Sequence, residues 1–98
     1  MEINKSINGS ELTVALVGRL DTTTAPALEA EMNASLGGIT ELILDFEKLE
    51  YVSSAGLRVI LACQKTMNKQ GNMKLINVCA DIMEVFEITG FSDILTIE

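Results

Sequence analysis

Two adjacent serines, Ser53 and Ser54, are the residues of this 98-residue chain best placed to take part in chemistry. They follow the β-prone run 42–46 and a short polar stretch, and they begin an apolar pattern that is typical of a buried helix. A serine at the start of a helix can accept a hydrogen bond from the first turn, and the helix dipole tolerates added negative charge at that end. The spacing therefore predicts either a helix cap, the more common role, or an acceptor of a phosphoryl group.

The rest of the composition offers little catalytic machinery. The chain has no histidine, which removes the usual general base, the commonest metal ligand and a phosphohistidine relay. A serine nucleophile would need a lysine as its base, and Lys65 follows Ser54 by about three helical turns, too far for proton transfer. Asp45 invites comparison with a phosphoaspartate receiver, but no acidic pair follows the first strand to hold magnesium. We therefore expect no catalytic residue, metal or cofactor.

Hydrophobic periodicity and turn residues predict the elements that position the serines. Thr24 is expected to cap the first helix, and Gly90 to end the last one in the left-handed conformation. The sequence predicts a single α/β domain, 1–98, with one mixed β-sheet (an N-terminal antiparallel hairpin, then parallel strands) packed with about three main α-helices. The expected elements are strands 3–7 and 12–17, a helix from 25 that ends at 37–38, strand 42–46, helix 54–69, strand 74–78, helix 81–88 and a closing strand 94–97.

Parallel strands joined through helices place their C-terminal ends on one edge of a sheet. This topology predicts a common rim that gathers the loop 21–24, the loop 47–53 and the turn 77–80. The rim is where open α/β sheets usually place functional groups, so the two serines are predicted to lie at the functional edge.

Winding residues 54–69 at 100° per residue separates two faces of the long helix. Arg58, Lys65 and Lys69 gather on the outer face. Leu57 and Leu61 lie between the faces, where they either form part of a docking patch or pack beneath a neighbouring helix. The inner face is predicted to consist of Gly56, Val59, Ile60, Cys63 and Met67.

Charge and cysteine content limit the class of partner. Fourteen acidic and seven basic residues give a net charge of −7, which disfavours binding to the phosphates of nucleic acids. No apolar stretch approaches the ~20 residues that span a bilayer, and the N-terminal residues lack the features of a secretion signal. Cys63 and Cys79 are isolated thiols within apolar patterns, so we expect both to be buried and reduced. These features predict a cytoplasmic protein that binds another protein, without nucleic acid or membrane.

Three motifs are spread along the chain: Gly-Arg-Leu-Asp at 18–21 with Thr24 and Ala25, Leu-Asp at 44–45 leading to Val-Ser-Ser-Ala-Gly-Leu at 52–57, and Thr-Gly-Phe at 89–91. With these motifs the chain resembles, over essentially its whole length, the STAS-domain anti-sigma factor antagonists of bacteria, also called anti-anti-sigma factors. The resemblance implies the STAS fold and binding to an anti-sigma factor that is also an ATP-dependent serine kinase. Binding releases the sigma factor, phosphorylation breaks the complex, and a PPM-type serine phosphatase restores it.

The same resemblance implies where the phosphate is carried. The family motif is commonly Asp-Ser-Ser/Thr-Gly, and its first serine is the acceptor, which corresponds to Ser54. Ser53 stands at the aspartate position and is a minor alternative acceptor, and Ala55 replaces the following hydroxyl. Asp21 would by itself be a turn or cap residue, but it matches a family position implicated in partner contact. The expected partner-binding residues are Asp21, Thr22, Thr23, Ser53, Ser54, Ala55, Gly56, Leu57, Arg58 and Leu61.

A second interpretation keeps the fold and changes the role. The chain would then be an interaction scaffold that is not phosphorylated, within a larger complex or beside a membrane transport system. The serine that follows the loop argues against this role without excluding it.

Overall fold

The sheet holds its four strands in chain order, β1-β2-β3-β4, in the computed structural model, which describes residues 1–98. β1 (Glu2–Asn8) pairs with β2 (Glu11–Leu20) in antiparallel fashion. β3 (Glu41–Val52) and β4 (Asn72–Ile76) follow in parallel. The predicted mixed sheet, a hairpin continued by parallel strands, is confirmed.

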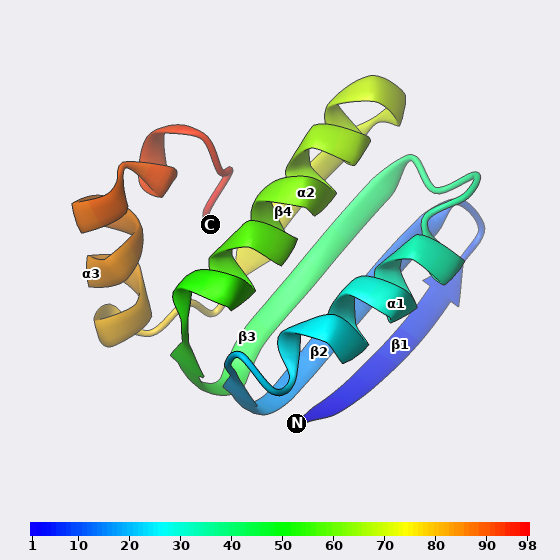
Figure 1. Ribbon diagram of the computed structural model, residues 1–98. Coiled ribbons are helices and arrows are strands. Elements are labelled where there is room, and N and C mark those ends of the chain that lie inside the picture. The colour runs from blue at the N-terminus through cyan, green and yellow to red at the C-terminus, as the bar shows by residue number, and fades with distance from the viewer.

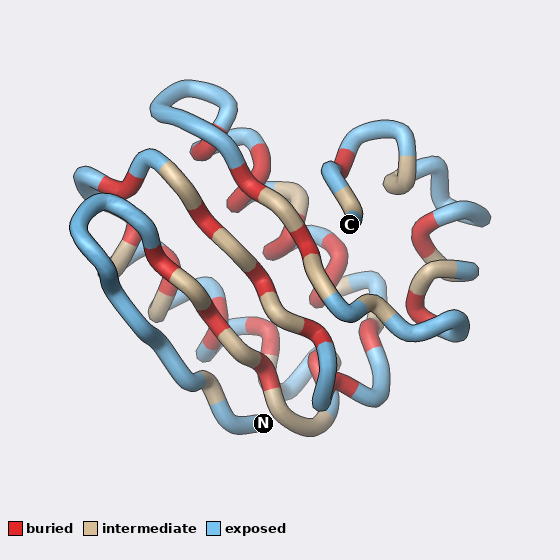
Figure 2. The backbone as a smooth tube through the Cα atoms, turned by 180° about the vertical axis from the view of Figure 1, so that it is seen from behind, coloured by how far each residue is buried: buried red, intermediate tan, exposed pale blue.

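Helices α1 (Ala25–Ser35) and α2 (Ser54–Gln70) cover one face of the sheet, and α3 (Ala80–Thr89) lies beyond β4 (Figure 1). A short 3-10 turn, Phe91–Asp93, follows α3. Seen from behind, the opposite face of the sheet is not covered by any helix (Figure 2). As predicted, Gly90 ends α3 with a left-handed φ of 81°. The helices and the sheet therefore form two layers, and one face of the sheet stays open.

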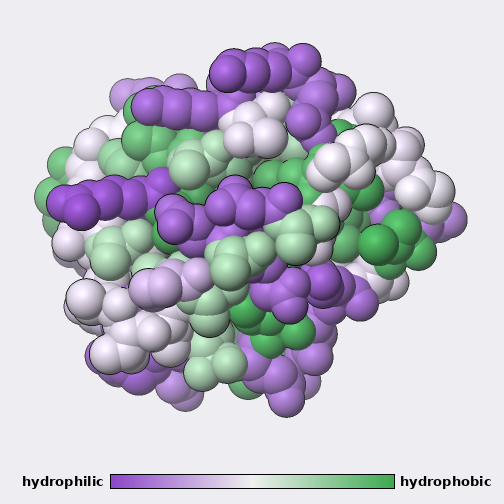
Figure 3. Space-filling model, turned by 45° about the vertical axis from the view of Figure 1, so that its right-hand side comes forward, coloured by the Kyte–Doolittle hydropathy of each residue, from purple (hydrophilic) through white to green (hydrophobic).

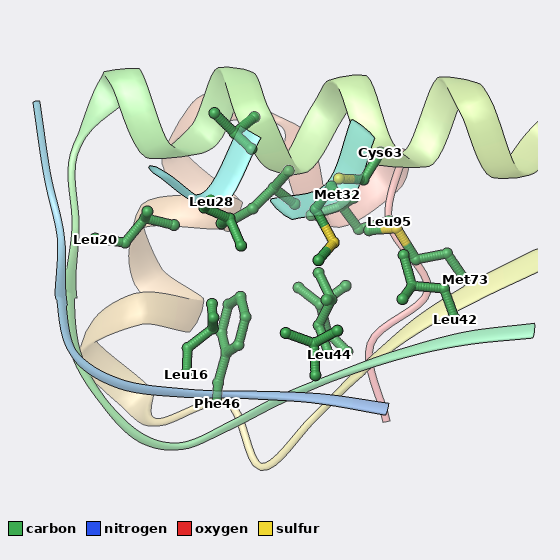
Figure 4. Close-up of a cluster of buried hydrophobic side chains, with 14 of the residues drawn as sticks. Leu16, Leu20, Leu28, Met32, Leu42, Leu44, Phe46, Cys63, Met73 and Leu95 are labelled. Carbon is green, nitrogen blue, oxygen red and sulfur yellow. The ribbon is translucent and has the colours of Figure 1, made fainter. Parts of the chain in front are cut away.

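The core fills the space between the sheet and the helices. Alternate residues of β2 and β3 point into it, including the fully buried Leu12, Leu44 and Phe46. Figure 4 shows Leu44 and Phe46 on the strand side of the core and Leu28 and Met32 of α1 on the opposite side. The predicted inner face of α2 is confirmed, because the structure buries all of its members, Gly56, Val59, Ile60, Cys63 and Met67.

The predicted loop 47–53 is wrong, because β3 continues to Val52. The pairing with β2 shifts register twice, and β3 carries one extra residue at each shift. Each bulge changes the spacing of inward side chains from two residues to three, as in Phe46, Leu49 and Val52, which are all buried. Because this spacing departs from the two-residue alternation of a strand, the sequence pattern of this half of β3 resembled that of a loop.

Three smaller predictions at the C-terminal side also differ from the structure. The closing strand 94–97 is reduced to one isolated bridge between Leu75 and Ile97, because the 3-10 turn leaves few extended residues. β4 stops at residue 76 because Asn77 adopts a left-handed φ of 57°. Cys79 is exposed, since it precedes α3 rather than facing the core. Cys63 is buried, which raises the pKa of its thiol to about 11.

Gly71 is expected to be the glycine least tolerant of a side chain. It ends α2, and a Cβ at this position would collide with the backbone of Thr40, whose Cα would lie 2.8 Å away. A backbone clash cannot be relieved by a rotamer change, so we expect Gly71→Ala to lower the free energy of unfolding by at least about 2 kcal/mol. Urea denaturation measures this change. The control Gly37→Ala, with no atom within 4 Å of the new Cβ, should stay within ~0.5 kcal/mol of wild type. Equal stability of the two variants would contradict the close approach.

Candidate functional site

The C-terminal ends of β2 and β3 bring the loop 21–24 together with residue 53, the last residue of the predicted segment 47–53. Leu20 and Val52 are paired at the ends of these parallel strands. The Ser53 N–H donates a hydrogen bond of 2.8 Å to the Leu20 carbonyl oxygen. The loop 21–24 and the first turn of α2 therefore lie side by side, as the ribbon in Figure 1 shows.

The third predicted segment, the turn 77–80, does not reach this rim. β4 ends at Ile76, which is paired with Asp45, so the turn lies beside the middle of β3. Asn77 Nδ2 donates a hydrogen bond of 3.0 Å to Asp45 Oδ1, and the Glu47 N–H donates to the same oxygen at 3.0 Å. Asp45 thus holds the first bulge of β3 and the turn together. The rim therefore consists of two segments, the loop 21–24 and the first turn of α2.

The two serines have different environments. Ser53 is half-buried at the N-cap of α2, and its Oγ accepts a hydrogen bond of 3.3 Å from the Gly56 N–H. Ser54 is the first residue of the helix and is exposed, and its hydroxyl has no hydrogen-bond partner within the chain. The capping role therefore belongs to Ser53, while the Ser54 hydroxyl is accessible to another protein.

Gly56 allows α2 to approach the end of β2 closely. A Cβ on this residue would lie 2.6 Å from Leu20 Cγ and 3.1 Å from the Leu20 carbonyl oxygen. The glycine of the serine motif therefore has a packing role, because it lets the first turn of α2 pack against the end of β2.

Burial corrects part of the expected partner surface. Leu57 is only 6% exposed and belongs to the core, so of the two predicted alternatives packing is confirmed at this residue and the docking patch is wrong. Gly56 is also buried, and neither residue offers a surface for a partner to touch. Ala55 and Leu61 are half-buried. The exposed members of the predicted set are Thr22, Thr23, Ser54 and Arg58, with Asp21 and Ser53 partly exposed.

Asp21 organises the loop between β2 and α1. Its Oδ1 accepts hydrogen bonds from the Thr23 hydroxyl at 2.7 Å, the Thr23 N–H at 3.0 Å and the Thr24 N–H at 3.2 Å. In return, Thr24 Oγ1 accepts a hydrogen bond of 2.8 Å from the Asp21 N–H and donates one of 2.9 Å to the Arg19 carbonyl oxygen. The predicted capping of α1 by the Thr24 side chain is therefore wrong, since this hydroxyl bonds back toward β2. Reciprocal bonds of this kind resemble a capping box with Asp21 as its first residue.

These hydrogen bonds make the loop sensitive to acid. The bond from the Thr23 hydroxyl, aided by the backbone N–H groups of Thr23 and Thr24, lowers the pKa of Asp21 below its ordinary value of 3.8. Because the folded pKa is the lower one, the ionised carboxylate stabilises the fold above pH 3.8, and this contribution disappears as the pH falls through the folded pKa.

We expect Asp21→Asn to lose less stability than wild type when the pH is lowered from neutral to below 3.8, because asparagine has no charge to titrate. Urea denaturation at a series of pH values measures the difference. The control is Asp93→Asn, which removes an exposed carboxylate whose oxygens accept no hydrogen bond within the chain. Superimposable pH profiles for wild type and Asp21→Asn would show that this carboxylate does not stabilise the fold.

Arg19 and Tyr51 form a feature of the rim that was not predicted from the sequence. The guanidinium carbon of Arg19 lies 4.3 Å from the centroid of the Tyr51 ring, and its Nε lies 3.9 Å from Asp21 Oδ2. The two residues meet because they are paired across β2 and β3. This pair extends the exposed rim next to the loop 21–24 with an aromatic ring and a cation, both of which are common at interfaces.

The structure also limits other classes of site. No group of three or more His, Cys, Asp and Glu side chains converges in a way that could hold a metal ion. None of the helices has the length and apolar character required to cross a membrane.

The sequence of this chain is similar to those of known anti-sigma factor antagonists. BtrV of Bordetella bronchiseptica, which is named as an anti-sigma factor antagonist, is 39% identical over 88 residues, covering 88% of this chain and 76% of the relative. The anti-sigma-B factor antagonist of Bacillus subtilis is 30% identical over 100 residues, covering 99% of this chain and 92% of the relative.

Solved structures agree with the fold. The antagonist SpoIIAA superposes with a TM-score of 0.79 in its unphosphorylated form, at 20% identity, covering 99% of this chain and 87% of that one. The phosphorylated form of the Bacillus protein gives 0.78, again at 20% identity, covering 99% and 91%. Residues 2–98 match the family model described as STAS domain. The chain therefore belongs to the STAS domain family, as its sequence motifs predicted.

Proposed function

We propose that this protein is an anti-sigma factor antagonist that binds an anti-sigma factor with serine kinase activity and is released when Ser54 is phosphorylated. The free, exposed hydroxyl of Ser54 on the rim is the observation that carries the proposal. Relatives that carry the name anti-sigma factor antagonist support the general role. We expect the protein and its partners to work in the cytoplasm.

The chain is a substrate in this cycle rather than an enzyme. In the kinase step Ser54 Oγ forms a bond to the γ-phosphorus of ATP, the bond from that phosphorus to the β–γ bridging oxygen breaks, and ADP leaves. The hydroxyl proton passes to a base of the kinase or to solvent. A PPM-type serine phosphatase then hydrolyses the phosphate ester, which regenerates the serine and releases inorganic phosphate.

A phosphate on Ser54 should leave the fold intact. The hydroxyl is exposed and stabilises nothing in the unmodified protein, because the cap is provided by Ser53. The positive end of the α2 dipole offsets part of the new charge, by ~0.3–1 kcal/mol. The switch therefore requires no refolding, and it acts through what the rim presents to a partner. The proposed contact surface consists of Asp21, Thr22, Thr23, Ser53, Ser54, Ala55, Arg58 and Leu61, without the buried Gly56 and Leu57.

Phosphate mapping tests the proposal. The purified protein is incubated with Mg-ATP and lysate of its host, and the products are analysed by tandem mass spectrometry. We expect one phosphate on Ser54, which persists in Ser53→Ala and disappears in Ser54→Ala. A phosphate on Thr22 or Thr23 instead would contradict the assignment, and the absence of any phosphate would favour the unphosphorylated scaffold.

A further inference from the structure

The exposed side of α2 carries positive charge and no negative charge. The helix contains Arg58, Lys65 and Lys69, and it contains neither Asp nor Glu. All three side chains are exposed, and none takes part in an ion pair within the chain. The rest of the chain contains all fourteen acidic residues and only four of the seven basic ones. This basic stripe, defined by these three residues, is an exception on a protein of net charge −7.

The stripe is straight and continuous with the proposed phosphate acceptor. Residues seven and eleven positions after Arg58 return to the same side of an α-helix to within ~20°. The three charges therefore lie along a line of about 16 Å, at 1.5 Å per residue. Ser54 lies one turn before Arg58, at the end of this line. A charge change at Ser54 consequently alters one end of the stripe.

Charged side chains interrupt the apolar surface on this side of the molecule. The space-filling view in Figure 3 shows strongly hydrophobic side chains only in small patches, separated by hydrophilic ones. A shallow, mainly apolar cleft between α1 and α2 is lined by Ala25, Pro26, Ala55 and Val59 together with Thr22, Glu29 and Arg58. Glu29 stays outside ion-pair distance of Arg58, so the guanidinium is available to another protein.

The remaining surface is acidic and would repel a negatively charged partner. The uncovered face of the sheet carries Glu11, Glu41 and Asp45, and α3 carries Asp81, Glu84 and Glu87. An acidic partner surface would thus be attracted to α2 and repelled from α3, from the open sheet face and from Glu29 on the neighbouring α1. Charge patterns of this kind steer encounter and fix orientation more than they add raw affinity.

We propose that the basic stripe docks on an acidic surface of the partner, and that phosphate on Ser54 closes the stripe by engaging Arg58. The inference rests on the proposed function, because it concerns the same partner and the same switch. Side chains four residues apart on a helix are neighbours, with Cβ atoms about 5–6 Å apart. Arginine donates two parallel hydrogen bonds to a phosphate, and a dianionic phosphate competes well with a carboxylate for it. The Arg58 guanidinium is then paired with the phosphate and no longer available to the partner. The phosphate also repels the partner's carboxylates.

Charge reversal along the stripe tests the docking. The binding of the anti-sigma factor recovered with the wild-type protein is measured by titration calorimetry at low and high salt. We expect Lys65→Glu and Lys69→Glu each to weaken binding about tenfold at low salt, with a smaller effect at high salt. Lys48→Glu is the matched control, because it makes the same charge change at an exposed position of β3 outside the stripe. We expect it to stay within about twofold of wild type.

Equal losses of affinity for Lys65→Glu and Lys48→Glu would overturn the docking proposal, because only net charge would then matter. Unchanged binding in all variants would overturn it as well. These outcomes are separate from a failure of the proposed function, which phosphate mapping on Ser54 decides. If the phosphate maps to Ser54 and the stripe variants bind like wild type, the inference alone is wrong.

A second measurement needs no partner. Phosphoserine is incorporated at position 54 by genetic code expansion, and the phosphorus NMR signal is followed against pH. We expect Arg58→Gln to move the titration midpoint of the phosphate to higher pH, because the nearby guanidinium favours the dianion. Lys48→Gln should leave the midpoint unchanged. Coincident titration curves for the wild-type and Arg58→Gln phosphoproteins would overturn the pairing.

Discussion

Ser54→Asp is expected to weaken binding of the anti-sigma factor at least tenfold, whereas Ser54→Ala is expected to bind within about twofold of wild type. The alanine form loses a hydroxyl that has no hydrogen-bond partner within the chain, so the rim keeps its geometry. The aspartate form adds one negative charge. Against a carboxylate at ~5 Å and an effective dielectric constant near 20, that charge costs roughly 3 kcal/mol before salt screening. About half of this cost is enough for a tenfold effect.

A binding titration with the purified partner measures both variants. The control is Ser6→Asp, which adds the same charge at an exposed position of β1, away from the rim, and should bind like wild type. Circular dichroism checks that each variant is folded. Equal binding by Ser54→Ala and Ser54→Asp would favour the scaffold role over the switch.

Phe46→Ala is expected to have the largest effect on stability. The ring is fully buried on β3, and it faces the fully buried ring of Phe86 on α3, with centroids 6.3 Å apart and planes inclined by 39°. Figure 4 shows Phe46 among the labelled core side chains. Removing a buried ring typically costs about 3–5 kcal/mol, because the cavity closes only partly. This is a large part of the ~5–15 kcal/mol by which most domains are stable.

Thermal and urea unfolding measure the loss, and the melting temperature should fall by at least ~12 °C, at about 4 °C or more per kcal/mol for a domain of this size. The control is Ile88→Ala on α3, whose side chain is 76% exposed and should change stability by no more than ~0.5 kcal/mol. A Phe46→Ala variant as stable as Ile88→Ala would contradict the assignment of this ring to the core.

Most elements could be predicted because their inward side chains follow a regular period. The inner face of α2 repeats as an α-helix requires, and β2 alternates buried and half-buried residues from Leu12 to Leu16. The second half of β3 could not be predicted, since its two bulges space Phe46, Leu49 and Val52 three residues apart. The position of the bulges depends on pairing with β2, which local sequence does not encode.

The candidate site could be located from the sequence, but the roles within it could not be assigned. Both serines fit a helix cap, and only the geometry of the first turn assigns this role to Ser53. Leu57 lies at the border of the helical faces, so a small rotation decides between the core and the surface. The stacking of Arg19 on Tyr51 depends on the strand register after both bulges, so it could not be predicted from the sequence.

The affinity of the purified anti-sigma factor for the protein carrying phosphoserine at position 54, compared with the unmodified protein, tests the central claim most directly. We expect the phosphorylated form to bind at least tenfold more weakly while its amide NMR spectrum retains the dispersion of the same fold. Equal affinity of the two forms would contradict the switch.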